Sequence, residues 1–205
     1  MSGSHGVWLK DLHRDADVEA QLIERVDAAF AKRADDAWQP FIAMAKAKAL
    51  AANAPSIPIE HAHWTWFEKV EDSAHLLSYR IVGIECDGHV QGLMMVLTDG
   101  FFSRVRGQER FPLAYVMYIA TAPWNYRPLT PNPWYAGVGT VLLGAAVELS
   151  LELGFKGRIG LHSLSQAEPF YECHGMVCLG IDAAKQHMKY YEFTEEQARA
   201  FIREE

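Results

Sequence analysis

Hydrophobic and polar positions alternate most clearly between Leu76 and Leu97, on either side of the dipeptide Asp87-Gly88. Alternation with a period of two is typical of strands with one buried face. A two-residue turn of this composition has the twist that a pair of antiparallel strands requires. The pattern therefore predicts a β-hairpin whose turn is Asp87-Gly88.

A continuous apolar run from Leu113 to Ala120 follows a polar segment, Ser103 to Glu109. The run is rich in β-branched and aromatic residues, so it predicts a buried central strand. The polar segment predicts an exposed loop before that strand. Other strands are predicted within residues 7–12, 155–163, 176–181 and 188–193.

Apolar residues recur at helical spacing in several other segments. Asp15 or Asp17 is the expected cap of the first helix, and Asp36 that of the second. Near the C-terminus, Thr194-Glu-Glu-Gln197 has the spacing of a capping box, in which each side chain bonds the other's backbone N–H. The predicted helices span about 15–32, 36–54, 58–70, 137–153 and 165–175, with a last one from 195 onward.

This order of elements predicts an α/β (α+β) fold, a mixed sheet with helices on both faces. The chain has 205 residues, of which 50% are hydrophobic. That length and composition suit one globular domain over residues 1–205 with a sizeable core. We find no repeat and no interdomain linker in the sequence.

Composition narrows the class of protein. No apolar run reaches the roughly 18 residues that a membrane span needs, and the N-terminus lacks the features of a signal peptide. Cys86, Cys173 and Cys178 form no CxxC pair, which favours reduced thiols and a cytoplasmic location. The net charge of −7 opposes a nucleic-acid surface. It mildly favours a cationic partner such as an amine, although ordinary solubility is the simpler explanation of the charge.

The segment from Leu113 to Gly154 joins the central strand, a proline-rich loop and a helix that opens at 137–140, Gly-Val-Gly-Thr. The first amides of a helix lack partners within it, and the helix dipole adds partial positive charge there. Glycine leaves such amides open to a phosphate. The segment therefore predicts a phosphate-bearing ligand; a helix cap or a close helix–strand contact is the alternative.

Residues 113–176 resemble the core of the GNAT (Gcn5-related) N-acetyltransferase family. Gly137 and Gly139 match the family's Gln/Arg-x-x-Gly-x-Gly/Ala loop. Ala167, Tyr171 and Gly175 keep the spacing of its Asn-x-x-Ala-x-x-x-Tyr-x-x-x-Gly-Phe helix. The departures are Trp134 in place of Gln or Arg, Ser165 as the residue nearest the missing Asn, and Met176 in place of Phe. The resemblance implies a mostly antiparallel sheet of about six or seven strands.

The resemblance also implies acetyl-CoA as co-substrate and no metal. The pantetheine arm would lie in the gap between residues 118–121 and 160–163, pairing with the backbone like an added strand. The pyrophosphate would rest on the amides at 137–140. The residues implied in cofactor binding are Ile119, Ala120, Thr121, Gly137, Val138, Gly139, Thr140 and Ser165.

By the same resemblance, Tyr171 would be the general acid that protonates the departing thiolate, since a phenol with a pKa near 10 keeps its proton at neutral pH. The alternative is that Phe170 and Tyr171 only pack the helix on the sheet. The base is less defined, because no Glu lies between Glu109 and Glu148. His162 is our candidate, since its unperturbed pKa is about 6.5. The alternatives are a hydrogen-bonded structural role for His162 and, as base, Glu168, Tyr118 or a water chain.

Two short motifs suggest other chemistry. His61 and His63 beside Glu60 are metal-ligand types, but they lack further ligands at a suitable spacing. Cys173-His174 could pair a nucleophile with a base, although neighbours on a helix are expected to point apart.

One arginine and one set of aromatic residues are further candidates for contact with a ligand. Arg127, in the loop before the glycines, could replace the missing Gln/Arg and meet a phosphate, or face solvent. A set of aromatic residues before the hairpin either lines an acceptor pocket or packs the core: Trp38, Trp64, Trp66 and Phe67.

The leading hypothesis is an acetyl-CoA-dependent N-acetyltransferase that acts on a primary amine by direct attack in a ternary complex. Its acceptor would be a small molecule or a peptide, and a homodimer is left open. The alternative is a non-catalytic acyl-CoA-binding or partner-binding module of GNAT type. The missing Glu, the missing Asn and Trp134 favour that alternative.

Overall fold

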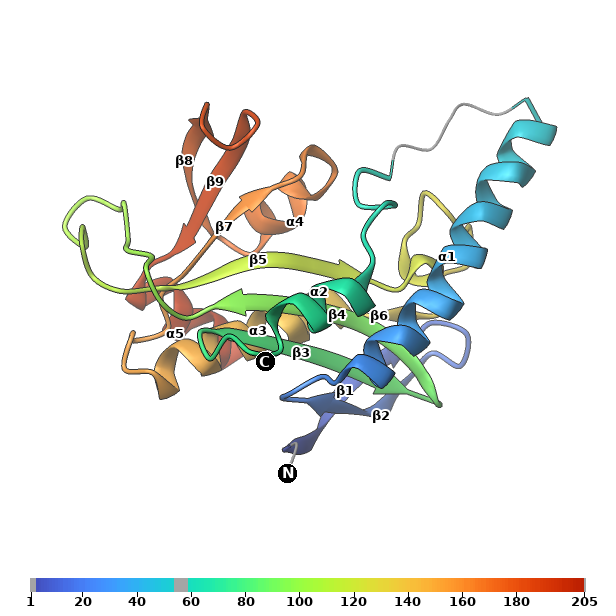
Figure 1. The fold of residues 1–205 in the computed structure, drawn as a ribbon, viewed down its shortest axis with the longest axis horizontal. Helices are drawn as coiled ribbons and strands as arrows, with labels where there is room; N and C mark the ends of the chain where they lie inside the picture. The colour runs from blue at the N-terminus through green and yellow to red at the C-terminus, as the bar shows by residue number, and fades with distance from the viewer. Residues whose placement is uncertain (1–2, 54–58, 205) are drawn as a thin grey trace. The chain divides into compact units, whose positions relative to one another are not determined.

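A computed structural model describes residues 3–53 and 59–204. These residues form a sheet of nine strands in the order β6-β1-β2-β3-β4-β5-β7-β9-β8 (Figure 1). The strands are β1 (Ser4–Asp11), β2 (Ala16–Ile23), β3 (Tyr79–Cys86), β4 (His89–Leu97), β5 (Ala114–Thr121), β6 (Tyr135–Ala136), β7 (Ile159–Ser163), β8 (Val177–Asp182) and β9 (Met188–Phe193). The helices are α1 (Ala28–Ala51), α2 (Trp66–Ser73), α3 (Val138–Glu152), α4 (Glu168–Cys173) and α5 (Glu195–Glu204), with 3₁₀ turns η1 (Pro123–Asn125) and η2 (Ser165–Ala167).

The sheet is mixed and mostly antiparallel, as predicted. β5 and β7 pair in parallel, whereas the β1–β2, β1–β6, β2–β3, β7–β9 and β8–β9 ladders are antiparallel. The predicted six or seven strands are too few. The two that were missed are β2 and the two-residue strand β6, which pairs with Lys10 and Asp11 of β1.

The helix predicted from Asp15 or Asp17 to Lys32 is wrong, because residues 16–23 form strand β2. β1 and β2 pair along all eight residues of each strand as a hairpin. Ala20 and Leu22 are buried while their neighbours are exposed or half-buried. The same apolar residues fit a period of two and a period near four over so short a stretch, and pairing with β1 selects the strand.

One long helix, α1, replaces the second predicted helix and begins earlier. Asp27 is its N-cap, and its carboxylate accepts a hydrogen bond from Phe30 N at 2.7 Å. Asp36, the expected cap, lies inside the helix. The third predicted helix starts at Trp66 instead of Pro58, which lies outside the described residues.

The predicted hairpin is confirmed. β3 and β4 flank Asp87 and Gly88, whose φ angles are 49° and 74°. Both angles lie in the left-handed region that a tight hairpin turn requires.

The chain divides into two compact units, which are described separately below. Unit 1 comprises Met1–Leu77, Ile81–Met94 and Ile119–Leu142; unit 2 comprises Ser78–Arg80, Met95–Tyr118 and Leu143–Glu205. Among the described residues, none of the helices combines the length and apolar character that crossing a membrane takes.

In unit 1, a carboxylate of α1 fixes the start of α2. Asp35 accepts hydrogen bonds from the backbone N–H groups of Trp66 at 3.0 Å and Phe67 at 2.8 Å. These are two of the amides that a helix leaves without internal partners. Burial raises the pKa of the Asp35 carboxyl, while the two amides oppose that rise. α1 and α2 are therefore joined by a polar contact as well as by apolar packing.

In unit 2, the C-terminal helix α5 begins with the predicted capping box. Thr194 N donates to Gln197 Oε1 at 3.0 Å, and Gln197 N donates to Thr194 Oγ1 at 3.2 Å. The reciprocal pair satisfies two amides at the start of α5. This helix follows directly on β9, whose Tyr191 and Phe193 are fully buried.

Candidate active site

The parallel ladder between β5 and β7, within unit 2, is short. Its register comprises three pairs and ends at Val116 opposite Leu161. Within the same unit, β5 continues to Tyr118 and β7 to Ser163. The described residues of these two strands therefore pair at one end and part at the other. A parting of this kind leaves backbone groups that an extended ligand can meet.

Burial along β5 changes where the ladder ends. Ala114, Tyr115 and Val116 are buried, whereas Met117, Tyr118 and Ile119 are half-buried. The last three residues of β5, predicted to bind the cofactor through their backbone, lie in unit 1. There Ile119 and Thr121 are half-buried and Ala120 is buried. A central strand that becomes accessible in mid-course is unusual for a plain core strand.

Helix α3 opens as the glycine pattern predicted. Gly137 has a φ of 89°, which favours glycine, and its carbonyl accepts from Val141 N at 2.9 Å. Gly137 is exposed, and a Cβ there would meet no atom within 4 Å. Gly139 and Thr140 are half-buried. Gly137 is thus accessible from outside, and Gly139 and Thr140 are accessible in part.

The side chain of Val138 faces inward and anchors the helix start. It is 2% exposed, and it lies close to Gly92 of β4, where a Cβ would come within 2.7 Å of it. Gly92 therefore lets the first turn of α3 approach the strand closely. The structure combines both readings of the glycine-rich segment, an accessible amide end and a close helix–strand contact.

The loop before α3 carries two stacked tryptophans. Trp134, which stands at the Gln/Arg position of the resemblance, stacks on Trp124 with ring centroids 5.0 Å apart. Trp134 N also donates to Trp124 O at 3.2 Å. Arg127 is exposed, so its predicted contact with a phosphate stays a prediction.

Neither a family sequence model nor a curated protein matches this chain. Solved structures do match it. The PaiA N-acetyltransferase of Thermoplasma acidophilum, in complex with coenzyme A, is 12% identical over 85% of this chain and 98% of its own, with a TM-score of 0.51. A GNAT-family protein of Desulfovibrio desulfuricans is 15% identical over 86% and 99%, with a TM-score of 0.52. Mycobacterium smegmatis RimJ, in complex with CoA-disulfide, is 13% identical over 98% and 94%, with a TM-score of 0.50.

The chain has the GNAT fold. At these identities the likeness concerns the fold, and the roles of individual residues rest on the geometry of this chain. The parting of β5 from β7 and the open start of α3 are the features of this GNAT fold that bear on a ligand.

Tyr171, the predicted general acid, lies in α4 and is 4% exposed. Its ring contacts Phe170 and Tyr191, with centroids 5.3 Å and 5.7 Å away. Burial raises the pKa of the Tyr171 hydroxyl well above its ordinary value, so the phenol keeps its proton at neutral pH. Its role as an acid stays a prediction.

Two other predicted site residues, Ser165 and Glu168, lie near Tyr171 in the sequence. Ser165 opens η2 directly after β7 and is exposed. Glu168, an alternative base, is half-buried and forms an ion pair with Lys189 at 2.6 Å. That pairing occupies the carboxylate.

His162, the predicted base, sits in a hydrogen-bonded chain. Its Nε2 lies 3.1 Å from Asp182 Oδ2, and its Nδ1 lies 2.7 Å from the Tyr115 hydroxyl. A carboxylate can only accept, so Nε2 carries the proton and Nδ1 accepts from Tyr115. The His162 side chain is 2% exposed. To act as a base, His162 would have to release Tyr115, and its assignment as base stays a prediction.

The same chain continues to the loop before β5. Arg104 donates to Asp182 at 2.8 Å, and its guanidinium lies over the Tyr190 ring at 4.3 Å. Arg104 and His162 hold the pKa of the Asp182 carboxyl down at about 2. Burial lowers the pKa of His162, although Asp182 partly opposes that effect.

These shifts predict how stability depends on pH. Because the folded pKa of His162 lies below the unfolded value of about 6.5, the unfolded state binds a proton first on acidification. Stability should therefore fall as the pH drops below about 6.5, and fall again between about 4 and 2 as Asp182 is protonated. Thermal unfolding of the parent, His162→Gln and the exposed control His75→Gln from about pH 7.5 to pH 5 tests this. His162→Gln should show a shallower decline than the other two; equal slopes in all three would refute the assignment.

Residues 103–109, the loop before β5, were predicted to be exposed, but the start of this loop is partly buried. Ser103 is 4% exposed, and its hydroxyl donates to Glu192 Oε2 at 2.6 Å. The backbone N–H of Arg104 donates to Glu192 Oε1 at 2.7 Å. Glu192 on β9 is 1% exposed. A buried carboxylate thus binds the start of this loop, a contact across 89 positions that local polarity could not indicate.

The expectation that Cys173 and His174 point apart is wrong. Cys173 Sγ lies 3.2 Å from His174 Nδ1, because α4 ends at Cys173 and both side chains turn toward Phe170 O. His174 Nδ1 lies 2.8 Å from that carbonyl. A nitrogen that donates to a carbonyl cannot also take the thiol proton. Cys173 and His174 are therefore in contact, but His174 is not positioned to act as the base for the Cys173 thiol.

The aromatic set divides into core and surface. Trp38 and Trp66 are buried, and the Trp38 indole donates to Val90 O at 3.1 Å. Phe67 is 37% exposed and Trp64 is half-buried. His61 packs on Trp64, with centroids 5.5 Å apart. Among the described residues, no group of three or more acidic, His or Cys side chains is placed to hold a metal ion.

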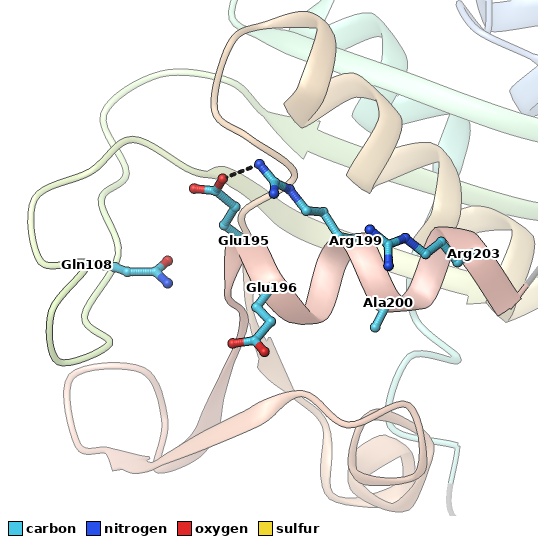
Figure 2. A pocket seen from close by; sticks show the side chains of 6 residues that line it. All are labelled: Gln108, Glu195, Glu196, Arg199, Ala200 and Arg203. Carbon is cyan, nitrogen blue, oxygen red and sulfur yellow. Dashed lines mark hydrogen bonds and ion pairs between the residues drawn. The ribbon is translucent and has the colours of Figure 1, made fainter.

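A cavity of about 490 Å³ lies in unit 2 along α5 (Figure 2). Figure 2 shows Gln108 facing this helix and Glu195 paired with Arg199. The lining residues are Gln108, Glu195, Glu196, Arg199, Ala200 and Arg203. None of the predicted site residues is among them, so this cavity does not enter the proposed reaction.

Sequence reasoning missed two buried polar residues, Gln91 and Glu192. Each is a single polar residue in a strand of mainly apolar neighbours, Val90–Leu97 and Tyr190–Phe193. A lone polar residue at such a position costs free energy unless it is hydrogen-bonded. That cost is the signal that could have marked both residues.

Proposed function

We propose that this chain is an N-acetyltransferase that moves the acetyl group of acetyl-CoA to a primary amine by direct attack in a ternary complex. The observation that carries the proposal is the short β5–β7 ladder, which stops after three pairs while both strands continue. The helix start at Gly137 supports it, because its backbone is accessible and its dipole favours an anion.

Coenzyme A suits these features chemically. Its diphosphate would bind the amides of residues 137–140, and its pantetheine arm would pair with the backbone of 119–121. Ser165 would contribute a hydroxyl, and Arg127, an exposed loop residue, would meet a phosphate. Two of the solved structures of this fold, PaiA and RimJ, contain coenzyme A or its disulfide. The likeness in fold supports the same class of ligand here.

The proposed reaction needs one acid and one base. The amine nitrogen attacks the thioester carbonyl carbon, and collapse of the tetrahedral intermediate breaks the C–S bond. The sulfur leaves with the bonding electrons and takes a proton from Tyr171. The surplus proton on nitrogen passes to the base, so the products are an N-acetyl amine and the CoA thiol. The phenol is then reprotonated from solvent.

The acceptor is proposed only as an amine. The net charge of −7 favours approach of a cationic amine over an anionic one.

The second candidate function is a non-catalytic acyl-CoA-binding or partner-binding module. It is favoured by the two hydrogen bonds that occupy His162 and by the ion pair that occupies Glu168. The two readings agree on coenzyme binding and differ on turnover.

Thermal unfolding with acetyl-CoA tests the shared part. A ligand at about a hundred times its Kd adds about 2.7 kcal/mol to the free energy of unfolding. For a chain of this length, that is a rise in Tm of roughly 5–10 °C. S-acetylpantetheine, which lacks the diphosphate, should raise Tm less at the same concentration. An unchanged Tm with acetyl-CoA up to millimolar concentration would refute coenzyme binding.

Release of free thiol across a panel of amines then separates the two readings. The enzyme reading predicts CoA release that depends on the amine and a product heavier by one acetyl group. Binding without release for any small amine or peptide would support the non-catalytic module.

A further inference from the structure

Gln91 is a polar residue at a position in β4 where an apolar residue would be expected. Its side chain is 0% exposed, and the residues around it in the strand are buried and mainly apolar. Burying an amide without partners would cost several kcal/mol. Hydrogen bonds to the Gln91 side chain must therefore offset that cost.

All the hydrogen-bonding capacity of the Gln91 side chain is used. Its oxygen accepts from Trp124 Nε1 at 2.9 Å and from Asn125 Nδ2 at 3.0 Å. Its nitrogen donates to Cys86 O at 3.3 Å and His89 O at 3.4 Å. Two donors and two acceptors are the full capacity of an amide side chain. Gln91 thus joins the hairpin turn after β3 to the loop after β5.

Both ends of that loop are bonded to Gln91 or to one of its partners. At its start, the backbone N–H of Ala122 donates to the main-chain carbonyl of Gln91 at 2.7 Å, a bond that does not need the side chain. At its end, Asn125 Oδ1 accepts from Tyr135 N at 3.0 Å, and Tyr135 lies two residues before Gly137. The indirect path from Gln91 through Asn125 therefore reaches the peptide that leads into α3. All of these residues belong to unit 1.

We propose that Gln91 is a positioning residue for coenzyme binding. It sets the backbone at the end of β5 and at the start of α3 relative to each other. This inference rests on the proposed function, in which both segments bind acetyl-CoA through main-chain groups. Main-chain contacts cannot be adjusted by a change of rotamer, so the placement of the peptide itself determines the fit. In this proposal Gln91 acts through the loop and not by direct contact with the coenzyme.

A volume-conserving apolar residue would fill the space without making the connection. In Gln91→Met, the Trp124 indole and the Asn125 amide lose their shared acceptor, and the loop loses its fixed position. We expect the Kd for acetyl-CoA to rise about tenfold or more. Asn125→Ala, at a half-buried position, breaks only the path to Tyr135 and should raise Kd in the same direction by a smaller factor.

Trp38→Phe is the matched control. The Trp38 indole makes a buried hydrogen bond to Val90 O, one residue from Gln91 in β4, and this bond has no partner in the loop. This variant should lower Tm as Gln91→Met does, but it should leave the Kd for acetyl-CoA within about twofold of the parent value. If lower stability alone weakened binding, the Kd for acetyl-CoA would rise in all three variants. A rise in the two loop variants but not in Trp38→Phe therefore indicates a positioning effect.

Calorimetric titration with acetyl-CoA and hydrogen exchange of the Tyr135 amide are the two measurements. The inference predicts weaker binding and faster Tyr135 exchange in Gln91→Met and Asn125→Ala, with neither change in Trp38→Phe. If the parent binds acetyl-CoA and both loop variants bind it equally well, the inference is overturned and the proposed function stands. If the parent does not bind, the proposed function fails. In that case the inference about coenzyme binding fails as well. Unchanged Tyr135 exchange in both loop variants would also exclude the structural link from Gln91 to Tyr135.

Discussion

Replacing Tyr171 by phenylalanine is expected to lower the rate of acetyl transfer by about 100-fold to 10,000-fold, while acetyl-CoA still binds. The hydroxyl is the only group removed, and the buried ring that packs against Phe170 and Tyr191 is retained. Without a proton donor, the CoA sulfur must leave as a free thiolate. The kcat for thiol release should therefore fall, and the Kd for acetyl-CoA should stay within about threefold.

Tyr191→Phe is the control for this experiment. Tyr191 is the neighbouring buried tyrosine, and its hydroxyl donates to Glu172 at 2.9 Å. Removing that hydroxyl should change stability more than turnover. The raised pKa of Tyr171 adds a second expectation, since its deprotonation should not limit the rate below about pH 10. Full activity of Tyr171→Phe would exclude the acid role and direct attention to water or another donor.

The second large effect concerns stability. Replacing Glu192 by alanine is expected to lower the free energy of unfolding by about 3–5 kcal/mol. The change leaves the buried Ser103 hydroxyl and the Arg104 backbone N–H without their carboxylate acceptor. The corresponding fall in Tm is roughly 6–20 °C for a chain of this length. Chemical denaturation monitored by tryptophan fluorescence gives the free energy directly.

Two variants calibrate that measurement. Glu192→Gln keeps the volume and one acceptor oxygen, so it should lose clearly less than Glu192→Ala. Glu196→Ala removes an exposed carboxylate four residues later and should change stability by no more than about 0.5 kcal/mol. If Glu192→Ala behaved like Glu196→Ala, the buried carboxylate would not be holding the loop before β5.

The features that the sequence determined are those whose partners lie close along the chain. The hairpin turn depends on two residues, Asp87 and Gly88, that tolerate positive φ. The two residues of the capping box, Thr194 and Gln197, are three positions apart. The start of α3 at Gly137 depends on a glycine whose φ is 89°. In each case the interaction closes within one turn, so residue type and spacing suffice.

The features that only the tertiary structure decided depend on distant partners. The stretch 16–23 carries apolar spacing compatible with helix or strand, and its pairing with β1 selected the strand. Gln91 and Glu192 are stabilised by partners 33 and 89 positions away. His162 became part of a chain with Tyr115 and Asp182 because β5, β7 and β8 bring them together. Sequence spacing determines local geometry, but a buried polar group is defined by whichever distant atoms satisfy it.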